Sequence, residues 1–397
     1  MIKMQESTTG GETRRETRLP VEIPTGIEVD YKNLTARQIA DLISRSQTGK
    51  IPFSLYMHEC LYGENGFYAK GKVKFTDEVD FVTYPEMSPA FGATVANYLE
   101  RAWKKMGKPK QFDLVEMGAG SGEMAKSILD WAQISNIDFY NALKYTVVEY
   151  GGGLIRRQIG KLNDHKNVKW IKGSAFELPV GQINGAFVSN ELPDAFPVEL
   201  VTKMGERIVQ KYISVRDNEW VEIWDEPTEE VKRYIRENDL VITSGLVEPI
   251  NMYARDFQAQ IDQALNRGIV ITFDYGELGQ VGSENPVRLY GLGIQGELNQ
   301  RYLYSHPGLV DITFSVNHKT LLLQGERDGM EKEIFGRQDE VLKEMGFDDV
   351  VETALIIEES PRSSKKEKDI LMRMMISRDY VVSPDTRIKG IVQSKNL

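Results

Sequence analysis

The chain of 397 residues contains little from which a metal centre or a disulfide scaffold could be built. Its single cysteine, Cys60, excludes an internal disulfide and a thiolate metal cluster, and so low a count is typical of a reducing compartment. The four histidines are far apart in the sequence and show no metal-ligand spacing. We therefore expect a protein without a metal site. An organelle presequence is poor in acids, whereas residues 1–30 include Glu6, Glu12 and Glu16, so we expect a flexible tail there and a cytoplasmic location.

Long apolar runs and an excess of positive charge are also missing. No stretch approaches the roughly 20 consecutive apolar residues that a membrane-spanning helix needs, so no membrane partner is expected. The formal net charge is −10, whereas proteins that bind nucleic acids present clustered Lys and Arg side chains. A nucleic-acid partner is therefore not expected either. The hydrophobic content of 41% supports a substantial core, in one large domain or in two.

The stretch from 112 to 128, FDLVEMGAGSGEMAKSI, is typical of a buried strand, a glycine turn and the start of a helix. Gly118, Gly120 and Gly122 allow the backbone to turn with positive φ beside a helix N-terminus, whose free N–H groups attract polar ligand atoms. The glycines follow an acid, Glu116, which would repel a pyrophosphate and attract an ammonium group. The pattern resembles the first motif of S-adenosylmethionine-dependent methyltransferases. The alternative is an ordinary glycine-rich turn.

Two further strand ends are predicted to complete a cofactor site. The short strand at 145–148 ends at Glu149, whose carboxylate could accept hydrogen bonds from both hydroxyl groups of a ribose. That acid could instead be a solvated charge at the strand end. After a third predicted strand at 168–171, the turn with Ala175 and Phe176 falls where methyltransferases contact adenine, although Phe176 could equally belong to the core.

The fourth predicted strand, 185–189, leads into a loop with two carboxylates, Glu191 and Asp194. Open α/β sheets bind ligands beyond the carboxyl ends of their strands, so this loop is predicted to face the methyl group of the cofactor, which Asn190 would contact. The two carboxylates suit a cationic acceptor, or they could cap the following helix. A fifth strand ends at Asp274, a third carboxylate that could neutralise the charge of a substrate.

The segment from 51 to 92 is dense in aromatic and turn residues and predicts a lid over the site. Its candidate substrate contacts are Tyr84, Glu86 and Met87. A structural Ω-type loop is the alternative. His306, in a later loop, could accept a proton but could also be an ordinary hydrogen-bonded loop residue.

Several blocks of sequence, in this order, resemble the MidA-type methyltransferase family. They are LYGENGFY, DFVTYPEMSPAFG, VEMGAGSGEMAKSIL, YTVVEY, SNELPDAFPVE, ITFDYGE and HPGLVDITFSV, between about residues 50 and 320. That family includes the mitochondrial arginine methyltransferase that assists assembly of respiratory complex I. The resemblance implies an α/β, Rossmann-like methyltransferase sheet of seven strands, S-adenosylmethionine as cofactor, and an arginine or an arginine-containing substrate.

Two positions depart from the family pattern. Tyr84 stands where the family has a small residue, and residues 315–318 read SVNH where the family usually has AHVD. Both could reshape the substrate pocket.

Arginine N-methylation agrees with the chemistry of the acidic loop. A guanidinium has a pKa above about 12 and delocalised lone pairs, so it is a poor nucleophile. Glu191 could pair with two of its N–H groups and draw positive charge onto the nitrogens that do not react, while Asp194 or a water chain takes the released proton. The alternatives are O- or C-methylation of another small metabolite, or an assembly protein that binds the cofactor without turnover. A dehydrogenase is a distant further alternative.

The chain order predicts one methyltransferase domain with additions. We expect a flexible tail at 1–30, an N-terminal helical and lid region at 31–106, the Rossmann-like domain at 107–380 with a β-hairpin insertion at about 198–250, and a second tail at 381–397. Residues 369–376 would supply the closing strand, and 330–345 a charged helix. The hairpin could wall the substrate pocket or form the contact of a homodimer.

Overall fold

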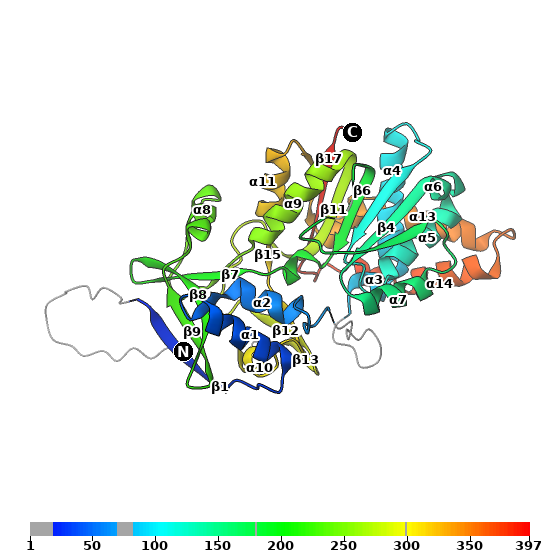
Figure 1. The fold of residues 1–397 in the computed structure, drawn as a ribbon. Helices are drawn as coiled ribbons and strands as arrows, with labels where there is room; N and C mark the ends of the chain where they lie inside the picture. Colours follow the sequence, from blue (N-terminus) through cyan, green and yellow to red (C-terminus); the bar gives the residue numbers. More distant parts are fainter. Residues whose placement is uncertain (1–18, 70–81, 179–180, 298–299) are drawn as a thin grey trace.

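A large sheet covered by helices on both faces and a smaller, mainly antiparallel part lie side by side in the computed structural model of the chain (Figure 1). The structure describes residues 19–69, 82–178, 181–297 and 300–397. Over these residues, no helix is both long enough and apolar enough to span a membrane.

The large sheet has the strand order β16-β17-β11-β6-β3-β4-β5, and the short strand β15 adds to β11. Its strands are β3 (Phe112–Met117), β4 (Leu143–Glu149), β5 (Val168–Lys172), β6 (Ile183–Asn190), β11 (Leu265–Glu277), β15 (Val316–Asn317), β16 (Glu331–Arg337) and β17 (Ile388–Lys395). The strands from β5 to β11 are parallel, and β17 is antiparallel to both of its neighbours. The predicted Rossmann-like sheet of seven strands is confirmed in this path.

Alternating side chains of the strands fill two separate cores, because successive residues of a strand point to opposite faces. Leu114 belongs to the core on one face and Val115 to the core on the other. The first core is closed by α4 (Pro89–Lys105), α5 (Glu123–Ser135), α6 (Ile137–Ala142), α12 (Gln338–Glu344), α13 (Phe347–Glu359) and α14 (Lys365–Val381), and the second by α9 (Met252–Ala264) and α11 (His318–Arg327). Burial on both faces explains why these strands read as continuous apolar runs.

The predicted hairpin is confirmed, within a larger sheet. Strands β8 (Arg207–Arg216) and β9 (Glu219–Asp225) are joined at Asp217 and Asn218, whose φ angles of 49° and 66° suit a tight hairpin turn. The remaining strands of this sheet are β1 (Val21–Glu28), β2 (Lys50–Pro52), β7 (Glu199–Met204) and β10 (Glu248–Ile250). Helix α8 (Glu229–Glu237) packs against its β7 side.

The prediction of a flexible tail through residue 30 is wrong for Val21–Glu28, because this segment is strand β1 and pairs with β9. Its side chains alternate between half-buried and exposed, so the segment is an edge strand with one face on the sheet. Composition did not reveal this, since a polar edge strand resembles a tail until its partner strand is known.

The predictions for the C-terminal region are also wrong. Residues 369–376 lie inside helix α14, and the supposed tail contains β17, which occupies a position between β11 and β16. The helix buries Leu371 and Met374, three residues apart, which is helical and not strand spacing. Residues 330–345, predicted as one helix, contain both β16 and α12. Residues 331–337 form a strand because they pair with β17, and a local sequence pattern does not show this distant partner.

The N-terminal region carries the small helices α1 (Leu34–Arg45), α2 (Phe53–Leu61) and α3 (Tyr84–Met87). The predicted irregular lid is therefore helical in part, and its residues 70–81 lie outside the described residues. A third sheet with β12 (Arg288–Gly291), β13 (Ile294–Glu297) and β14 (Asp311–Thr313), together with α10 (Gln300–Ser305), packs with α1 and α2 into one core.

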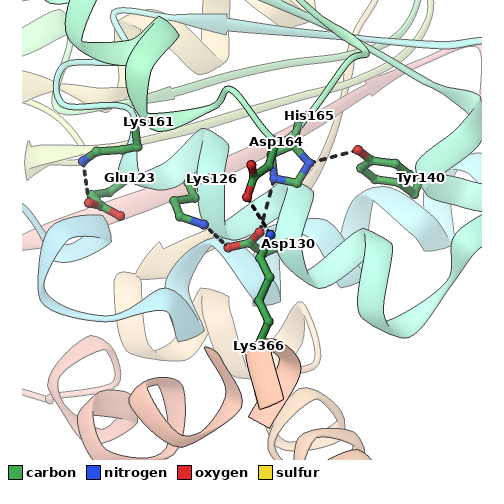
Figure 2. A network of polar contacts seen from close by, with 8 residues as sticks. All are labelled: Glu123, Lys126, Asp130, Tyr140, Lys161, Asp164, His165 and Lys366. Atoms are coloured by element: carbon green, nitrogen blue, oxygen red, sulfur yellow. Dashed lines mark hydrogen bonds and ion pairs between the residues drawn. The ribbon is translucent and has the colours of Figure 1, made fainter. Parts of the chain in front are cut away.

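A polar network holds helix α5, whose first turn follows the glycine turn (Figure 2). Asp130 accepts a hydrogen bond from Lys126 and lies 3.2 Å from Nε2 of His165, and the Nδ1 atom of His165 is 2.9 Å from the hydroxyl of Tyr140. Burial would raise the pKa of Asp130, but these two donors hold that pKa below its usual value. Two ion pairs flank the network: Glu123 with Lys161, and Asp164 with Lys366. The first pair joins α5 to α7 (Gly152–Lys161), and the second joins the loop after α7 to α14. The start of α5, directly after the glycine turn, is therefore tied to α7.

Candidate functional site

A cavity of about 440 Å³ opens beyond the carboxyl ends of β3, β4 and β6 and extends to the third sheet. Ligands of open α/β sheets bind at this edge. Among the described residues that line it are seven carboxylates and no Lys, Arg or His. The carboxylates are Glu86, Glu116, Glu123, Glu149, Glu191, Asp194 and Asp311. This lining suits a ligand with positive charge.

The glycine turn forms one wall of the cavity. Gly118, Gly120 and Gly122 have φ angles of 67°, 53° and 81°, a left-handed conformation that side chains other than glycine rarely adopt. A Cβ atom on Gly118 would lie 2.9 Å from Cδ1 of Leu192, the mobile end of a side chain that could shift, so the positive φ is the stronger reason for glycine there. Gly118 and Gly120 line the cavity, whereas Gly122 lies just behind it as the N-cap of α5. The sequence prediction of a tight glycine turn before a helix is confirmed.

Glu116 lies at the floor of the cavity in strand β3. Its carboxylate accepts a hydrogen bond of 2.8 Å from the hydroxyl of Tyr145 on the neighbouring strand β4. Burial raises the pKa of Glu116 to about 8, although the bond from Tyr145 opposes the rise and the charge of Glu149 adds to it. A buried carboxylate with this pKa would gain from a cationic partner.

Glu149, at the end of β4, is buried and hydrogen bonded on both oxygens. Oε1 accepts from the backbone N–H of Gly151 at 3.1 Å, and Oε2 accepts from Nε2 of Gln158 at 3.1 Å. The same Gln158 amide donates to the carbonyl of Gly120 at 2.9 Å. Gln158, which sequence reasoning missed, therefore links the predicted ribose carboxylate to the glycine turn. Burial raises the pKa of Glu149, and these hydrogen bonds oppose the rise.

Ala175 and Phe176 line the cavity, as predicted for an adenine site. The ring of Phe176 lies 5.2 Å from that of Tyr62 and 5.1 Å from that of Phe196, both at steep angles. Phe176 is also partly buried and packs against two of the hydrophobic cores. Phe176 therefore combines the two roles that the sequence left open, cavity wall and core residue.

The acidic loop after β6 has a constrained backbone. Glu191 has a φ of 49°, which is unusual for a residue other than glycine, and its Oε1 accepts a hydrogen bond of 3.0 Å from Nδ2 of Asn190. The short 3₁₀ helix η1 (Pro193–Ala195) follows, and no side chain caps it. The alternative of helix capping is therefore not what the structure shows for Glu191 and Asp194. Both side chains line the cavity with Asn190.

Two carboxylates of this loop have strongly shifted pKa values. Burial raises the pKa of Glu191 to about 8, and the charges of Asp194 and Glu86 add to the rise. Burial and the charge of Asp311 raise the pKa of Asp194 to about 8. Oδ1 of Asp194 is buried and has no hydrogen-bond partner among the described residues. Such an acceptor is costly to leave unpaired, which indicates that a donor from a ligand belongs there.

The structure places Asp274 behind the cavity and not in it. Its side chain is fully buried, Oδ2 accepts from the backbone N–H of Asp194 at 3.0 Å, and Oδ1 accepts from that of Tyr275 at 2.7 Å. The predicted contact between Asp274 and the charge of a substrate is therefore corrected. The parallel sheet brings the end of β11 beside the end of β6, so this carboxylate fastens the acidic loop instead.

Replacing Asp274 by asparagine is expected to lower the free energy of unfolding by about 1–3 kcal/mol, because the amide NH₂ cannot accept one of the two backbone N–H bonds. Urea denaturation followed by tryptophan fluorescence measures the change. The exposed residue Asp369, changed in the same way, is the control. Equal stability of the two variants would show that the buried bonds do not fasten the loop.

The lid candidates have different outcomes. Glu86 lines the cavity, where its Oε2 accepts from the backbone N–H of Thr83 at 3.0 Å, and burial raises its pKa. Tyr84 packs against the core of the large sheet, and Met87 is 39% exposed; neither lines the cavity. His306 follows α10, where its Nδ1 lies 2.7 Å from Oγ of Ser305, and it also lies away from the cavity. For these three residues, the predicted substrate contact is corrected.

Sequence reasoning missed several tyrosines and one acid of the cavity lining. Tyr68, Tyr275, Tyr290 and Asp311 also line the cavity. Tyr68 and Asp311 lie in the blocks LYGENGFY and HPGLVDITFSV, which carried the family resemblance. Tyr68 and Asp311 come close together only because the third sheet forms, and no local sequence pattern predicts that sheet.

The fold and the cavity together define a methyltransferase of the S-adenosylmethionine-dependent class. Residues 94–336 match the family model for S-adenosyl-L-methionine-dependent methyltransferases, and the chain belongs to this family. S-adenosylmethionine is accordingly its cofactor. The crystal structure of a protein from Burkholderia thailandensis bound to S-adenosyl-homocysteine has the same fold, with a TM-score of 0.72, 24% identity and 92% of each chain covered.

Curated relatives include arginine methyltransferases. The Drosophila melanogaster protein arginine methyltransferase NDUFAF7 homolog is 43% identical over 108 residues, which are 27% of this chain and 24% of that protein. The mouse NDUFAF7 protein is 21% identical over 383 residues, 88% of this chain and 84% of that protein. The matched part of the chain thus spans about a quarter of the length of the Drosophila protein. It spans about a fifth of the Xenopus tropicalis NDUFAF7 protein, which the chain also matches.

The predicted cytoplasmic location is wrong in the light of these relatives, because they are named as mitochondrial proteins. The prediction depended on the low cysteine count and on the acids within residues 1–30, which are unlike an organelle presequence. That count indicates a reducing environment and does not distinguish one reducing compartment from another.

Proposed function

We propose that this methyltransferase transfers a methyl group to the guanidinium of an arginine, free or within a protein. The observation that carries the proposal is the cavity lining, in which seven carboxylates meet no basic side chain among the described residues. Such a lining favours a cationic acceptor. The names of the curated relatives support arginine in particular.

The cofactor fits the wall built by β3 and β4. We assign its ammonium group to Glu116 and its ribose hydroxyls to Glu149, with the N–H groups of the glycine turn beside its carboxylate. Ala175 and Phe176 would enclose the adenine. The Oδ1 atom of Asn190 has no hydrogen-bond partner among the residues that the structure describes, so it is an acceptor that a ligand donor could satisfy. The sulfonium supplies the methyl group, which moves to nitrogen as the sulfur–carbon bond breaks.

The acceptor is held by the acidic loop. Glu191 would accept two N–H bonds of the guanidinium, fix its plane and keep positive charge on the nitrogens that do not react. The left-handed backbone of Glu191 and its bond from Asn190 hold the carboxylate in place before the acceptor arrives. Asp194, with a raised pKa, would take the proton that the methylated nitrogen releases. Orientation and fixed charge would supply most of the rate enhancement.

Activity is expected to rise with pH. Because burial raises the pKa of Glu191 to about 8, its carboxyl is largely protonated at pH 7 in the free enzyme, and only the ionised form can hold a guanidinium. Values of kcat/KM, measured at saturating cofactor between pH 6 and 9, should increase at least about tenfold per unit below pH 7, more steeply if Asp194 must also be ionised, and level off above about 8. The two neighbouring acids titrate as a pair, so the profile gives apparent values for the pair. A flat profile would contradict the role of the loop.

The direct test is methyl transfer itself. The protein is incubated with S-adenosylmethionine that carries a labelled methyl group, together with free arginine, small guanidines and arginine-containing proteins. Mass spectrometry then locates the label. Label on a guanidinium nitrogen supports the proposal. Label on a hydroxyl group or a carbon atom, with every arginine unmodified, would favour the rival O- or C-methyltransferase.

An assembly protein that binds the cofactor without turnover is a rival from another class. It would bind S-adenosylhomocysteine and transfer no label to any acceptor. The shifted carboxylates of the acidic loop favour an enzyme, since perturbed pKa values cluster at catalytic sites. A homodimer, and the lack of nucleic-acid and membrane partners, stay predictions from the sequence.

A further inference from the structure

A second acidic part of the cavity lining belongs to the third sheet, and the sequence alone assigned it no role. Asp311 is the first residue of β14 in the third sheet, and its side chain is 3% exposed. Its Oδ2 atom accepts a hydrogen bond of 2.9 Å from the hydroxyl of Tyr68, and Oδ1 accepts from the backbone N–H of Ile312 at 2.9 Å. Asp311 lies opposite Tyr290 in the pairing of β14 with β12, and both side chains line the cavity.

Backbone bonds fix the distance between this part of the lining and the acidic loop. The carbonyl of Asp194 accepts a hydrogen bond of 2.9 Å from the N–H of Phe314, which follows β14 directly. The N–H of the same Asp194 donates to Asp274, and the carbonyl of Ala195 accepts from the hydroxyl of Tyr62 at 3.1 Å. The third sheet, the loop and the large sheet are thus joined at one residue, so the two acids cannot move apart independently.

The two acids are electrostatically coupled, and the unpaired atom of Asp194 favours a cation. The charge of Asp311 raises the pKa of Asp194, of Tyr62 and of Tyr68. Arg288, on the neighbouring strand β12, acts in the opposite direction on Asp194. Asp194 is itself 7% exposed, and its Oδ1 atom has no partner within the described part of the chain. A donor with positive charge would satisfy that atom and relieve the repulsion between the carboxylates.

We propose that Asp311, oriented by Tyr68, is a specificity-determining residue that acts with Asp194 to select a positively charged acceptor over a neutral one of the same shape. The proposal rests on the proposed function, because it concerns the acceptor half of the same cavity. Glu191 fixes the plane of the reacting group, and the carboxylates of Asp194 and Asp311 together stabilise its positive charge. Recognition of the substrate therefore requires both parts of the molecule, the large sheet and the third sheet.

Binding of two matched probes tests this proposal. N-acetyl-arginine amide and N-acetyl-citrulline amide have nearly the same shape, but only the first is charged, and neither carries a carboxylate that the acidic lining would repel. Isothermal titration of each probe is carried out on the protein saturated with S-adenosylhomocysteine. We expect the wild-type protein to prefer the arginine probe at least tenfold, and the Asp311→Asn variant to lose that preference. In the Tyr68→Phe variant, the ratio of the two affinities should fall about threefold.

The controls separate this proposal from the proposed function. Asp369→Asn, on the exposed side of α14, should keep the full preference, and S-adenosylhomocysteine should bind equally to all variants. A retained preference in Asp311→Asn would overturn the selectivity role of this residue and leave arginine methylation intact. A wild-type protein that does not distinguish the probes would overturn both. If Asp311→Asn fails to fold, the Tyr68→Phe variant carries the test, and an unchanged preference there would overturn the proposal.

Discussion

Replacing Glu191 by glutamine is expected to lower kcat at least 100-fold while the affinity for S-adenosylmethionine changes less than twofold. Removal of one preorganised group that stabilises charge in a transition state typically costs a factor of 10² to 10³. Glutamine keeps the size of the side chain, but its NH₂ group cannot accept a guanidinium N–H, so the plane and the charge distribution of the acceptor are no longer fixed. Single-turnover transfer of a labelled methyl group to an arginine acceptor measures the loss.

A matched variant shows whether the effect is specific to the loop. Glu177 is an exposed acid near the adenine turn and does not line the cavity, so Glu177→Gln should keep the wild-type rate. Cofactor affinity of both variants is measured by titration with S-adenosylhomocysteine. If Glu191→Gln kept its rate at an unchanged melting temperature, the acidic loop would not be the acceptor site, and the proposed mechanism would fail.

Replacing Glu149 by alanine is expected to raise the dissociation constant of S-adenosylhomocysteine about 100-fold. The carboxylate would otherwise accept bonds from two ribose hydroxyls, and hydrogen bonds to a charged group contribute about 1.5–3 kcal/mol each. A net loss near 3 kcal/mol corresponds to roughly a hundredfold change in affinity. The Gln158 amide also loses an acceptor, which loosens its link to the carbonyl of Gly120. Isothermal titration measures the affinity.

Two further variants show whether the loss of affinity is specific to the carboxylate of Glu149. Glu149→Gln keeps the volume and one acceptor oxygen, so it should lose less affinity than the alanine variant. Glu177→Ala removes an exposed acid nearby and should bind the ligand as the wild-type protein does. Unchanged affinity in a folded Glu149→Ala protein would place the ribose elsewhere in the cavity.

The cofactor half of the site was predictable because it is local. The acid in β3 and the glycine turn and helix that follow this strand are contiguous, so their chemistry is visible in one short stretch of sequence. Glu149 also marks the end of its own strand. Gln158 was missed because its contacts are tertiary: a helix must pack against the sheet before its side chain reaches Gly120 and Glu149.

The acceptor half was only partly predictable. Glu191 and Asp194 follow a recognisable strand, so their place at the sheet edge could be inferred. The role of Asp274 could not, because whether a strand-end carboxylate points into a cavity or accepts backbone N–H groups depends on the loop beside it. Tyr84 and His306 were assigned by position in the sequence, and their packing places them elsewhere.

The sequence by itself determined the class of fold, the glycine turn and the acids at the strand ends, because each depends on neighbours only a few residues away. The tertiary structure decided which acids share a cavity, which one fastens a loop, and that β1 and β17 are strands of sheets. Those outcomes depend on pairing and burial between segments far apart in the chain. The energy of such contacts exists only once the segments have been brought together.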